Sequence, residues 1–568
     1  MLQKWIALSN TTIGQLMATI NTSIIIVALP PIFRGIHLNP LAPQSFPYLL
    51  WTIMSYMIVV SVLLLTIGRL SDMYGRVRLF NLGFLIFTIG SILLYLTPGT
   101  GYTAATELII FRIVQAVGGS FIMANSFAII TDNFPGEGRG FALSINSVAA
   151  VSGVSIGIVL GGFLSVIYWR DVFLISVPVG IFGTFWSYFR LKETSMKKRD
   201  RLDIPGNILF AAGIIILLIG VTYGITPYGK NPMGWTNPFV IISLLTGTLL
   251  LIIFPFIEKK SGNPMFRIDF FKIKGFSIGN FTAFISAMEM MGLMYMLTIL
   301  FQGVWLPIHG YPFYITPLWA GIYMLPMTVS MGLFGILGGR LSDRYGFRIL
   351  TSAGLFISAF SLVLLAFLPY NFSYYLMGII LVIFGIGYGL FNAPNISAVM
   401  SVVPPEARGT ASGMVNTMRN TGYTASMGLF FSILIYGLSK SLPVTISSSL
   451  RAKNAGQLIP YLIHMPPTEA IFGTFLGINP VSAIISGIPG PVISSVPANA
   501  LSTITGNTWF SYVFAPAFMG SLDTVFFIVA GITVFAGLIS LLRDRDRISI
   551  DKKTGSSSKI IKRLKEYK

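Results

Sequence analysis

The sequence Gly68-Arg-Leu-Ser-Asp-Met-Tyr-Gly75 occurs again, with a single change, as Gly339-Arg-Leu-Ser-Asp-Arg-Tyr-Gly346, at an offset of 271 residues. A second pair of related segments, residues 135–140 and 404–409, is separated by 269 residues. Two independent motifs with nearly the same offset indicate that the chain contains an internal duplication. The fold is therefore expected to be built from two related halves.

The sequence around these motifs is strongly apolar. Of the 568 residues 54% are hydrophobic and 10% are charged, and the mean hydropathy is +0.78. Soluble domains carry about 25% charged residues, so this composition indicates a protein that spans a membrane several times. The chain contains no cysteine, which excludes disulfides and thiolate chemistry.

Apolar runs long enough to cross a membrane occur throughout the chain. A hydrocarbon core of about 30 Å requires roughly 20 helical residues. Runs of this length, separated by charged residues or by glycine and proline, predict fourteen membrane-spanning helices near residues 11–33, 48–68, 79–97, 105–130, 141–166, 172–190, 204–226, 237–257, 275–300, 317–338, 349–369, 374–400, 409–438 and 516–542.

The distribution of basic residues predicts the orientation of these spans. With the N-terminus in the cytoplasm, 30 Lys and Arg residues fall on the cytoplasmic side and 6 on the outer side. This asymmetry follows the positive-inside rule and places both termini in the cytoplasm. A fifteenth span within residues 439–515 would move the basic tail outside, so we interpret this stretch as an extracellular loop.

Both copies of each repeated motif fall on the predicted cytoplasmic side, so the two repeats are expected to be parallel. The motifs are eight spans apart although each repeat holds six, and residues 203–274 therefore fit as a two-helix insertion. We expect an all-α membrane protein with a six-helix bundle at 1–190, a basic linker and insertion at 191–274, a second bundle at 275–542 that includes loop 439–515, and a basic cytoplasmic tail at 543–568. Parallel six-helix halves are typical of rocking transporters with a substrate site between the halves.

The repeated motif resembles the signature loop of the major facilitator superfamily, and the insertion is similar to that of its 14-spanning drug:proton antiporter branch. The resemblance covers nearly all of residues 10–542. It implies a conformational latch on the cytoplasmic side, although a charge-anchored turn is the alternative reading. The latch residues would be Gly68, Arg69, Asp72, Gly75 and Arg76 in the first half and Gly339, Arg340, Asp343 and Gly346 in the second.

Two further motifs of this family occur in the first half. Arg112 and Gln115 resemble the motif of the fourth span, whose arginine is implicated in proton coupling. Four glycines resemble the antiporter motif of the fifth span and would form a gating helix, although ordinary close helix packing explains them equally well. They are Gly153, Gly157, Gly161 and Gly162. Ile158 replaces the proline of the family pattern, which weakens the antiporter interpretation.

The branch usually places an aspartate in the first span, where this chain has Asn21. Asparagine cannot carry a proton, but its amide can bind a substrate. Glu289 lies near the centre of the ninth span and is our first candidate for the proton-carrying acid, with a neutral structural glutamate as the alternative. Asp523, closer to the outer end of the last span, is a second candidate.

The expected function is secondary active transport by alternating access, with proton-coupled export of hydrophobic or cationic drugs. The absence of an acid at Asn21 leaves open a carrier for another metabolite or an organic anion that would use Arg112. The sequence contains no P-loop, no HExxH motif and no Cys/His metal spacing, so an enzyme or an ATP-driven pump is not favoured. We expect a monomer in the plasma membrane that contacts lipids, protons and a small-molecule substrate but no nucleic acid, metal or cofactor.

Overall fold

The computed structural model describes residues 2–39, 42, 45–134, 139–193, 203–229, 231–260, 266–404 and 408–543. Within these ranges the chain is helical, and β pairing is limited to one isolated bridge between Tyr228 and Asn231. Residues 135–138 and 405–407 of the second repeated motif, and the basic tail after Arg543, lie outside the described residues.

Fourteen helical segments are long and apolar enough to cross a membrane, which confirms the predicted number of spans. The first eight are formed by α1 (Leu2–Gly35), α2 (Ser45–Tyr74), α3 (Arg76–Tyr95), α4 (Gly101–Asn133), α5 (Arg139–Ile167), α6 (Asp171–Leu174) with α7 (Ser176–Arg190), α8 (Ile204–Gly224) and α9 (Pro238–Lys260). The last six are formed by α10 (Lys274–Ile299) with the π-turn η2 (Leu300–Trp305) and α11 (Leu306–Ile308), α12 (Thr316–Tyr323) with α13 (Leu325–Tyr345), α14 (Phe347–Ala366), α15 (Tyr374–Ser401), α16 (Arg408–Ala452) and α22 (Asn507–Leu541).

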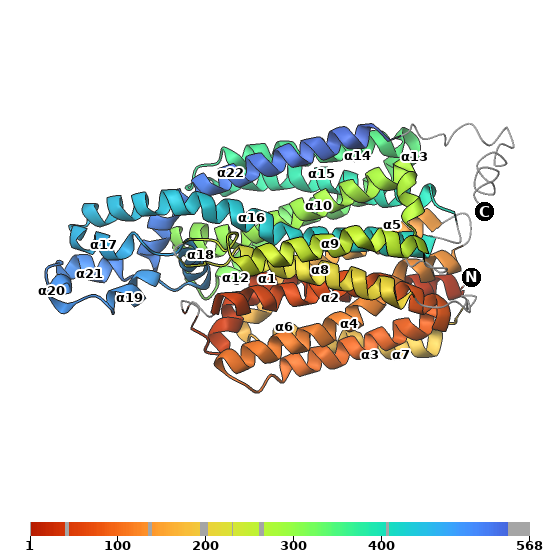
Figure 1. The fold of residues 1–568 in the computed structure, drawn as a ribbon, viewed down its shortest axis with the longest axis horizontal. Helices are drawn as coiled ribbons and strands as arrows, with labels where there is room; N and C mark the ends of the chain where they lie inside the picture. Colours follow the sequence, from red (N-terminus) through yellow and green to blue (C-terminus); the bar gives the residue numbers. More distant parts are fainter. Residues whose placement is uncertain are drawn as a thin grey trace.

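The helices form one elongated bundle (Figure 1). Helix α1 starts and helix α22 ends at the same end of this bundle, which we call the terminal end. The short helices that precede α22 project from the opposite end, which we call the far end. An even number of spans between the two termini produces this arrangement.

The repeated motif forms the same tight reversal in both halves, between α2 and α3 and between α13 and α14. Gly75 has φ +107° and Gly346 has φ +84°. A side chain at either position would be strained, so glycine lets one helix end and the next begin without a loop. The duplication seen in the sequence is therefore also a duplication of backbone geometry.

The two-helix insertion packs against both halves of the bundle through α8. On α2, Thr66 Oγ1 donates to Asn207 Oδ1 at 2.7 Å, and Thr222 Oγ1 approaches Met54 Sδ at 3.2 Å. On α16, Val221 of α8 packs directly on Gly428. The opposite helix, α9, presents a row of exposed apolar side chains, as expected of a surface that faces lipid.

The segment expected to be an extracellular loop at 439–515 is largely helical and shorter than predicted. Helix α16 continues to Ala452 and α22 begins at Asn507. The intervening residues form the short helices η4 (Gly456–Leu458), α17 (Ile459–Leu462), α18 (Pro467–Leu476), α19 (Pro480–Ile485), α20 (Gly490–Ser494) and α21 (Ala498–Ile504). Helix α18 is buried and packs on the π-turn, where Phe475 lies beside Gly303.

Candidate functional site

A buried polar cluster joins α1 and α4 and contains three of the predicted residues, Asn21, Arg112 and Gln115. Arg112 Nη1 donates to Gln115 Oε1 at 2.9 Å and to the Asn21 carbonyl oxygen at 3.2 Å. Gln115 Nε2 donates to Asn21 Oδ1 at 3.1 Å and to Ser91 Oγ at 2.8 Å. Asn21 Nδ2 in turn donates to Ser176 Oγ at 2.5 Å. The family motif on α4 is thus connected directly to the position where the expected aspartate is missing.

Arg112 is 1% exposed, and within the described ranges no carboxylate lies close enough to form a salt bridge with it. Its guanidinium carbon lies 4.7 Å from the centre of the Tyr56 ring, a cation–π contact. Amide oxygens, a backbone carbonyl and this aromatic ring therefore stabilise the buried charge. Asn21 supplies part of that support, because its carbonyl and its amide both belong to the cluster.

Glu289 is fully buried in the second half of the molecule. Its Oε2 accepts a hydrogen bond from Ser358 Oγ of α14 at 3.4 Å, and Thr533 of α22 also lies near the carboxyl group. Its Oε1 has no hydrogen-bond partner among the described residues. The structure therefore places Glu289 between α10, α14 and α22, away from the polar cluster around Arg112.

The second candidate acid, Asp523, lies on α22 and is half-buried, and no described residue forms a hydrogen bond with its Oδ1. No contact connects it with Asn21, Arg112 or Glu289. The predicted coupling residues thus fall into three separate places in the fold.

The first copy of the predicted latch forms a network of ion pairs at the terminal end. Arg76 pairs with Asp72 at 2.8 Å and with Asp132 of α4 at 2.6 Å, so it ties α2 and α3 to α4. The Glu193 carboxylate accepts from the backbone N–H of Val77 at 3.0 Å and thereby caps α3. A carboxylate at a helix N-terminus is favoured by the exposed N–H groups and the helix dipole.

In the same motif Gly68 and Arg69 are half-buried at the end of α2. In the second copy Gly339 lies in α13 and Arg340 is exposed. The side chain of Asp343 lies outside the described residues. Whether either copy acts as a latch stays a prediction.

The predicted gating glycines bring α5 against its neighbours. A Cβ atom at Gly157 would lie 2.5 Å from the Ile20 carbonyl oxygen, and one at Gly161 would lie 2.6 Å from that of Ile24. A Cβ atom at Gly153 would lie 2.8 Å from the Leu16 carbonyl oxygen. Three glycines one turn apart therefore let α5 pack directly on the backbone of α1. Gly162 faces another way and contacts Pro317 of α12, in the second half.

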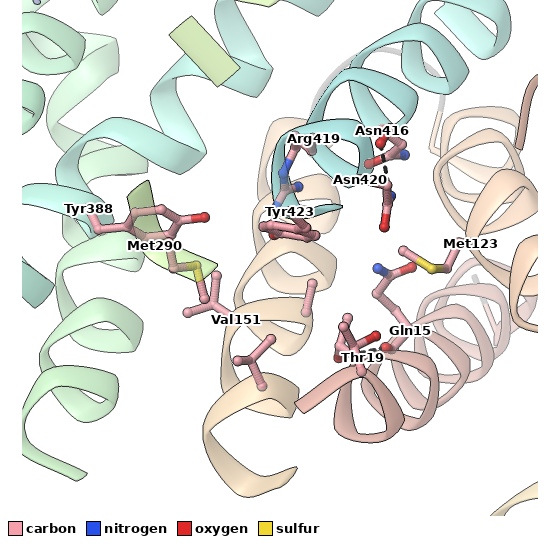
Figure 2. Close-up of a pocket in the computed structure, with 13 residues that line it drawn as sticks. Gln15, Thr19, Met123, Val151, Met290, Tyr388, Asn416, Arg419, Asn420 and Tyr423 are labelled. Atoms are coloured by element: carbon pink, nitrogen blue, oxygen red, sulfur yellow. Dashed lines mark hydrogen bonds between the residues drawn. The ribbon is translucent and has the colours of Figure 1, made fainter. Parts of the chain in front are cut away.

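A narrow pocket lies where α1, α4 and α5 of the first half face α10, α15 and α16 of the second (Figure 2). It contains about 470 Å³ of empty space, counting the part open to solvent. Its lining combines amides, hydroxyls, two tyrosines and one arginine with apolar side chains. The lining residues are Gln15, Thr19, Thr22, Met123, Ala150, Val151, Val154, Met290, Tyr388, Asn416, Arg419, Asn420 and Tyr423.

None of the five predicted coupling or substrate residues lines this pocket. Met290 lines the pocket, whereas its neighbour Glu289 points away from it toward Ser358 of α14. Arg419 was detectable from the sequence, because an arginine inside a membrane span is rare and usually marks a functional site. No sequence signal distinguished Gln15, Tyr388 or Asn420 from ordinary polar residues of a helix.

The two halves approach each other more closely at the far end than at the terminal end. Towards the far end, a Cβ at Gly321 of α12 would lie 3.0 Å from the Ile158 carbonyl oxygen of α5, and Gln302 Nε2 donates to the Val27 carbonyl oxygen of α1 at 3.2 Å. Towards the terminal end, a Cβ at Gly335 of α13 would lie 3.9 Å from Val148 of α5. The seam between the halves is therefore tighter at the far end.

A sequence model described as Major Facilitator Superfamily matches residues 11–427. The chain belongs to this superfamily. Its members are carriers rather than enzymes, so the chain is a multi-pass membrane transporter of small molecules. Among solved structures, a bacterial homologue of the human lysosomal transporter Spinster shares the fold, with a TM-score of 0.55, 16% identity, and coverage of 96% of this chain and 98% of that one.

The names of curated relatives within the superfamily indicate different substrates. The riboflavin transporter RibZ of Clostridioides difficile is 31% identical over 447 residues, which cover 77% of this chain and 90% of RibZ. The multidrug resistance protein Stp of Mycobacterium tuberculosis is 28% identical over 434 residues, 76% of each chain. Multidrug resistance protein 3 of Bacillus subtilis is 28% identical, over 74% of this chain and 78% of its own.

Proposed function

We propose that this carrier exports small molecules by alternating access, with the pocket between α1, α5, α15 and α16 as its substrate site. The observation behind this proposal is that residues of both halves line one pocket while the seam is tighter at the far end. Rocking of the halves about this pocket would open it alternately to either side. The division into bundles at 1–190 and 275–542, joined by 191–274, is part of this proposal.

The energy source that we propose is the proton gradient, with Glu289 as the proton-carrying acid and no other cofactor. Glu289 is fully buried, and the polar side chains at its carboxyl group, Ser358 and Thr533, are both neutral. No basic side chain forms a salt bridge with it among the described residues, so its charge state is free to change. Because it lies outside the pocket, a proton and a substrate would act at separate places and be coupled through α10.

We propose that the terminal end of the bundle faces the cytoplasm. We also propose that the carrier lies in the plasma membrane and is a monomer. The asymmetry of 30 against 6 basic residues supports this orientation. The multidrug resistance relatives support drugs as substrates, and the riboflavin transporter RibZ supports a metabolite instead. Drug:proton antiport is therefore one candidate within a broader exporter function.

The test is transport in proteoliposomes under an imposed pH gradient, with ethidium, riboflavin and fluorescein as cationic, neutral and anionic probes. We expect the gradient to accelerate the flux of at least one probe through the wild type. Glu289→Gln, which removes the titratable group but retains a similar shape, should abolish this acceleration while probe exchange without a gradient persists.

Asp523→Asn tests the second candidate acid in the same assay, and it should keep the response to the gradient because the proposal assigns the proton to Glu289 alone. A response lost in Asp523→Asn and kept in Glu289→Gln would assign the proton to Asp523 instead. An undiminished response in Glu289→Gln would exclude Glu289 as the proton carrier. The absence of flux of all three probes through folded wild-type protein would contradict the exporter proposal.

A further inference from the structure

The pocket contains one charged side chain, Arg419 of α16. Its Nη2 donates to the hydroxyl of Tyr423 at 3.2 Å, and the hydroxyl of Tyr388 from α15 also faces the guanidinium group. Both partners are neutral phenols. They fix the position of the guanidinium group but do not neutralise it.

No carboxylate is present among the pocket-lining residues that the structure describes. Arg419 is half-buried at the pocket wall, and no aspartate or glutamate forms a salt bridge with it within the described ranges. A charge held away from bulk water is costly unless an opposite charge accompanies it. The pocket is therefore complementary to a negative group and repels a cation.

A second polar side chain in the pocket, Gln15, has an oxygen atom that is not used in a hydrogen bond among the described residues. Gln15 of α1 is 3% exposed, and its Oε1 accepts no hydrogen bond from any residue that the structure describes. Figure 2 shows Gln15 and Asn420 pointing toward the same space, opposite Tyr388 and Met290. A buried acceptor without a donor is unfavourable, so a ligand with an N–H or O–H group would satisfy it.

The remaining wall is apolar and adaptable. Met123 and Met290 enter the pocket from opposite halves, and Val151 and Val154 line it from α5. Methionine side chains fit irregular ligands because they are flexible and polarizable. The lining as a whole combines a cationic anchor, an unfilled acceptor and a hydrophobic wall.

We propose that the pocket binds organic anions, in which a carboxylate or another acidic group pairs with Arg419, a donor group reaches Gln15 and an apolar body lies against the methionines. This inference rests on the proposed function, because it takes the pocket as the transport site. It replaces Arg112 by Arg419 as the anion-binding residue, since Arg112 is fully buried in its own amide cluster and does not line the pocket. It also makes cationic drugs poor ligands of this site.

The test compares two dyes with the same tricyclic core and opposite charge, fluorescein as the anion and rhodamine 123 as the cation. Binding to the purified full-length carrier is measured by fluorescence polarisation at a mildly acidic pH, at which fluorescein carries its carboxylate and keeps one phenolic O–H that can donate to Gln15. The proteins compared are the wild type, Arg419→Gln, Arg419→Lys and Gln15→Leu. Arg451→Gln serves as the matched control, because Arg451 is an exposed arginine on the same helix.

Wild type and Arg451→Gln should prefer fluorescein. Arg419→Gln should weaken its binding at least about tenfold, as loss of a buried charge partner predicts. Arg419→Lys should retain part of the affinity, and Gln15→Leu should weaken it by a smaller factor. A wild type that prefers rhodamine 123 or shows no charge preference would overturn the proposal, as would unchanged fluorescein binding by a folded Arg419→Gln.

The proposed function and this inference can fail separately. Fluorescein binding that depends on Arg419 without flux of any probe in proteoliposomes would support the anion site and contradict the exporter. Flux of ethidium that depends on Glu289, together with no binding of fluorescein, would support the exporter and overturn the anion site.

Discussion

Gly157→Leu should abolish transport and strongly lower the thermal stability of the purified carrier. A Cβ at this position would overlap Ser23 Oγ and lie 2.5 Å from the Ile20 carbonyl oxygen. Backbone atoms of α1 cannot move aside without displacing Asn21, which belongs to the Arg112 cluster. Overpacking of this kind typically costs about 1–3 kcal/mol, and a rigid backbone neighbour places it at the upper end.

Gly531→Leu is the matched control for this substitution. Gly531 lies in α22 and has no neighbouring atom within 4 Å of a built Cβ, so the added side chain meets open space. It should transport and unfold like the wild type. Thermal unfolding followed by size-exclusion chromatography and probe flux in proteoliposomes are the two measurements. Normal stability and flux in Gly157→Leu would contradict the close packing of α1 on α5.

Arg112→Met should lower the free energy of unfolding by about 2–4 kcal/mol, the range expected when a buried polar network loses a charged member. The substitution leaves Gln115 Oε1 and the Asn21 carbonyl oxygen without their donor. It also removes the cation–π contact with Tyr56. Chemical denaturation in detergent measures the loss.

The double variant Arg112→Met/Gln115→Leu provides the comparison for this network. Because both partners of one hydrogen bond are then apolar, its destabilisation should be smaller than the sum of the two single effects. Additive losses would show that the two side chains do not interact. A fully stable Arg112→Met that no longer responds to a pH gradient would instead assign Arg112 to proton coupling.

The sequence was sufficient to predict the number of spans and the duplication, because both depend on local signals. Apolar runs of spanning length are visible in one dimension, and Gly75 and Gly346 mark the same reversal twice. The same local signals led the sequence analysis to underestimate the length of α16. Ser439 and Lys440 are polar and follow the apolar run, so the sequence predicts a loop there. The helix nevertheless continues through them to Ala452.

The pocket could not be predicted in the same way, because its lining depends on how each helix is rotated. Glu289 and Met290 are adjacent, but successive residues of a helix point about 100° apart. Met290 therefore reaches the pocket while Glu289 faces Ser358. Arg419 carried a usable signal as a charge inside a span, whereas Gln15 became informative only when its unpartnered oxygen was located.

Helix α16 connects the pocket physically with the far end of the molecule. It has 45 residues and is about 68 Å long at 1.5 Å per residue, more than twice the thickness of a hydrocarbon core of about 30 Å. Arg419 lies near one end of this rod and the exposed Val444 and Arg451 near the other. The far-end arm of the helix packs on α22 and on the short helices α17 and α18, so a change in the tilt of α16 would displace these elements with it. A spin label on that arm would let a spectroscopist follow the transport cycle at a distance from the ligand.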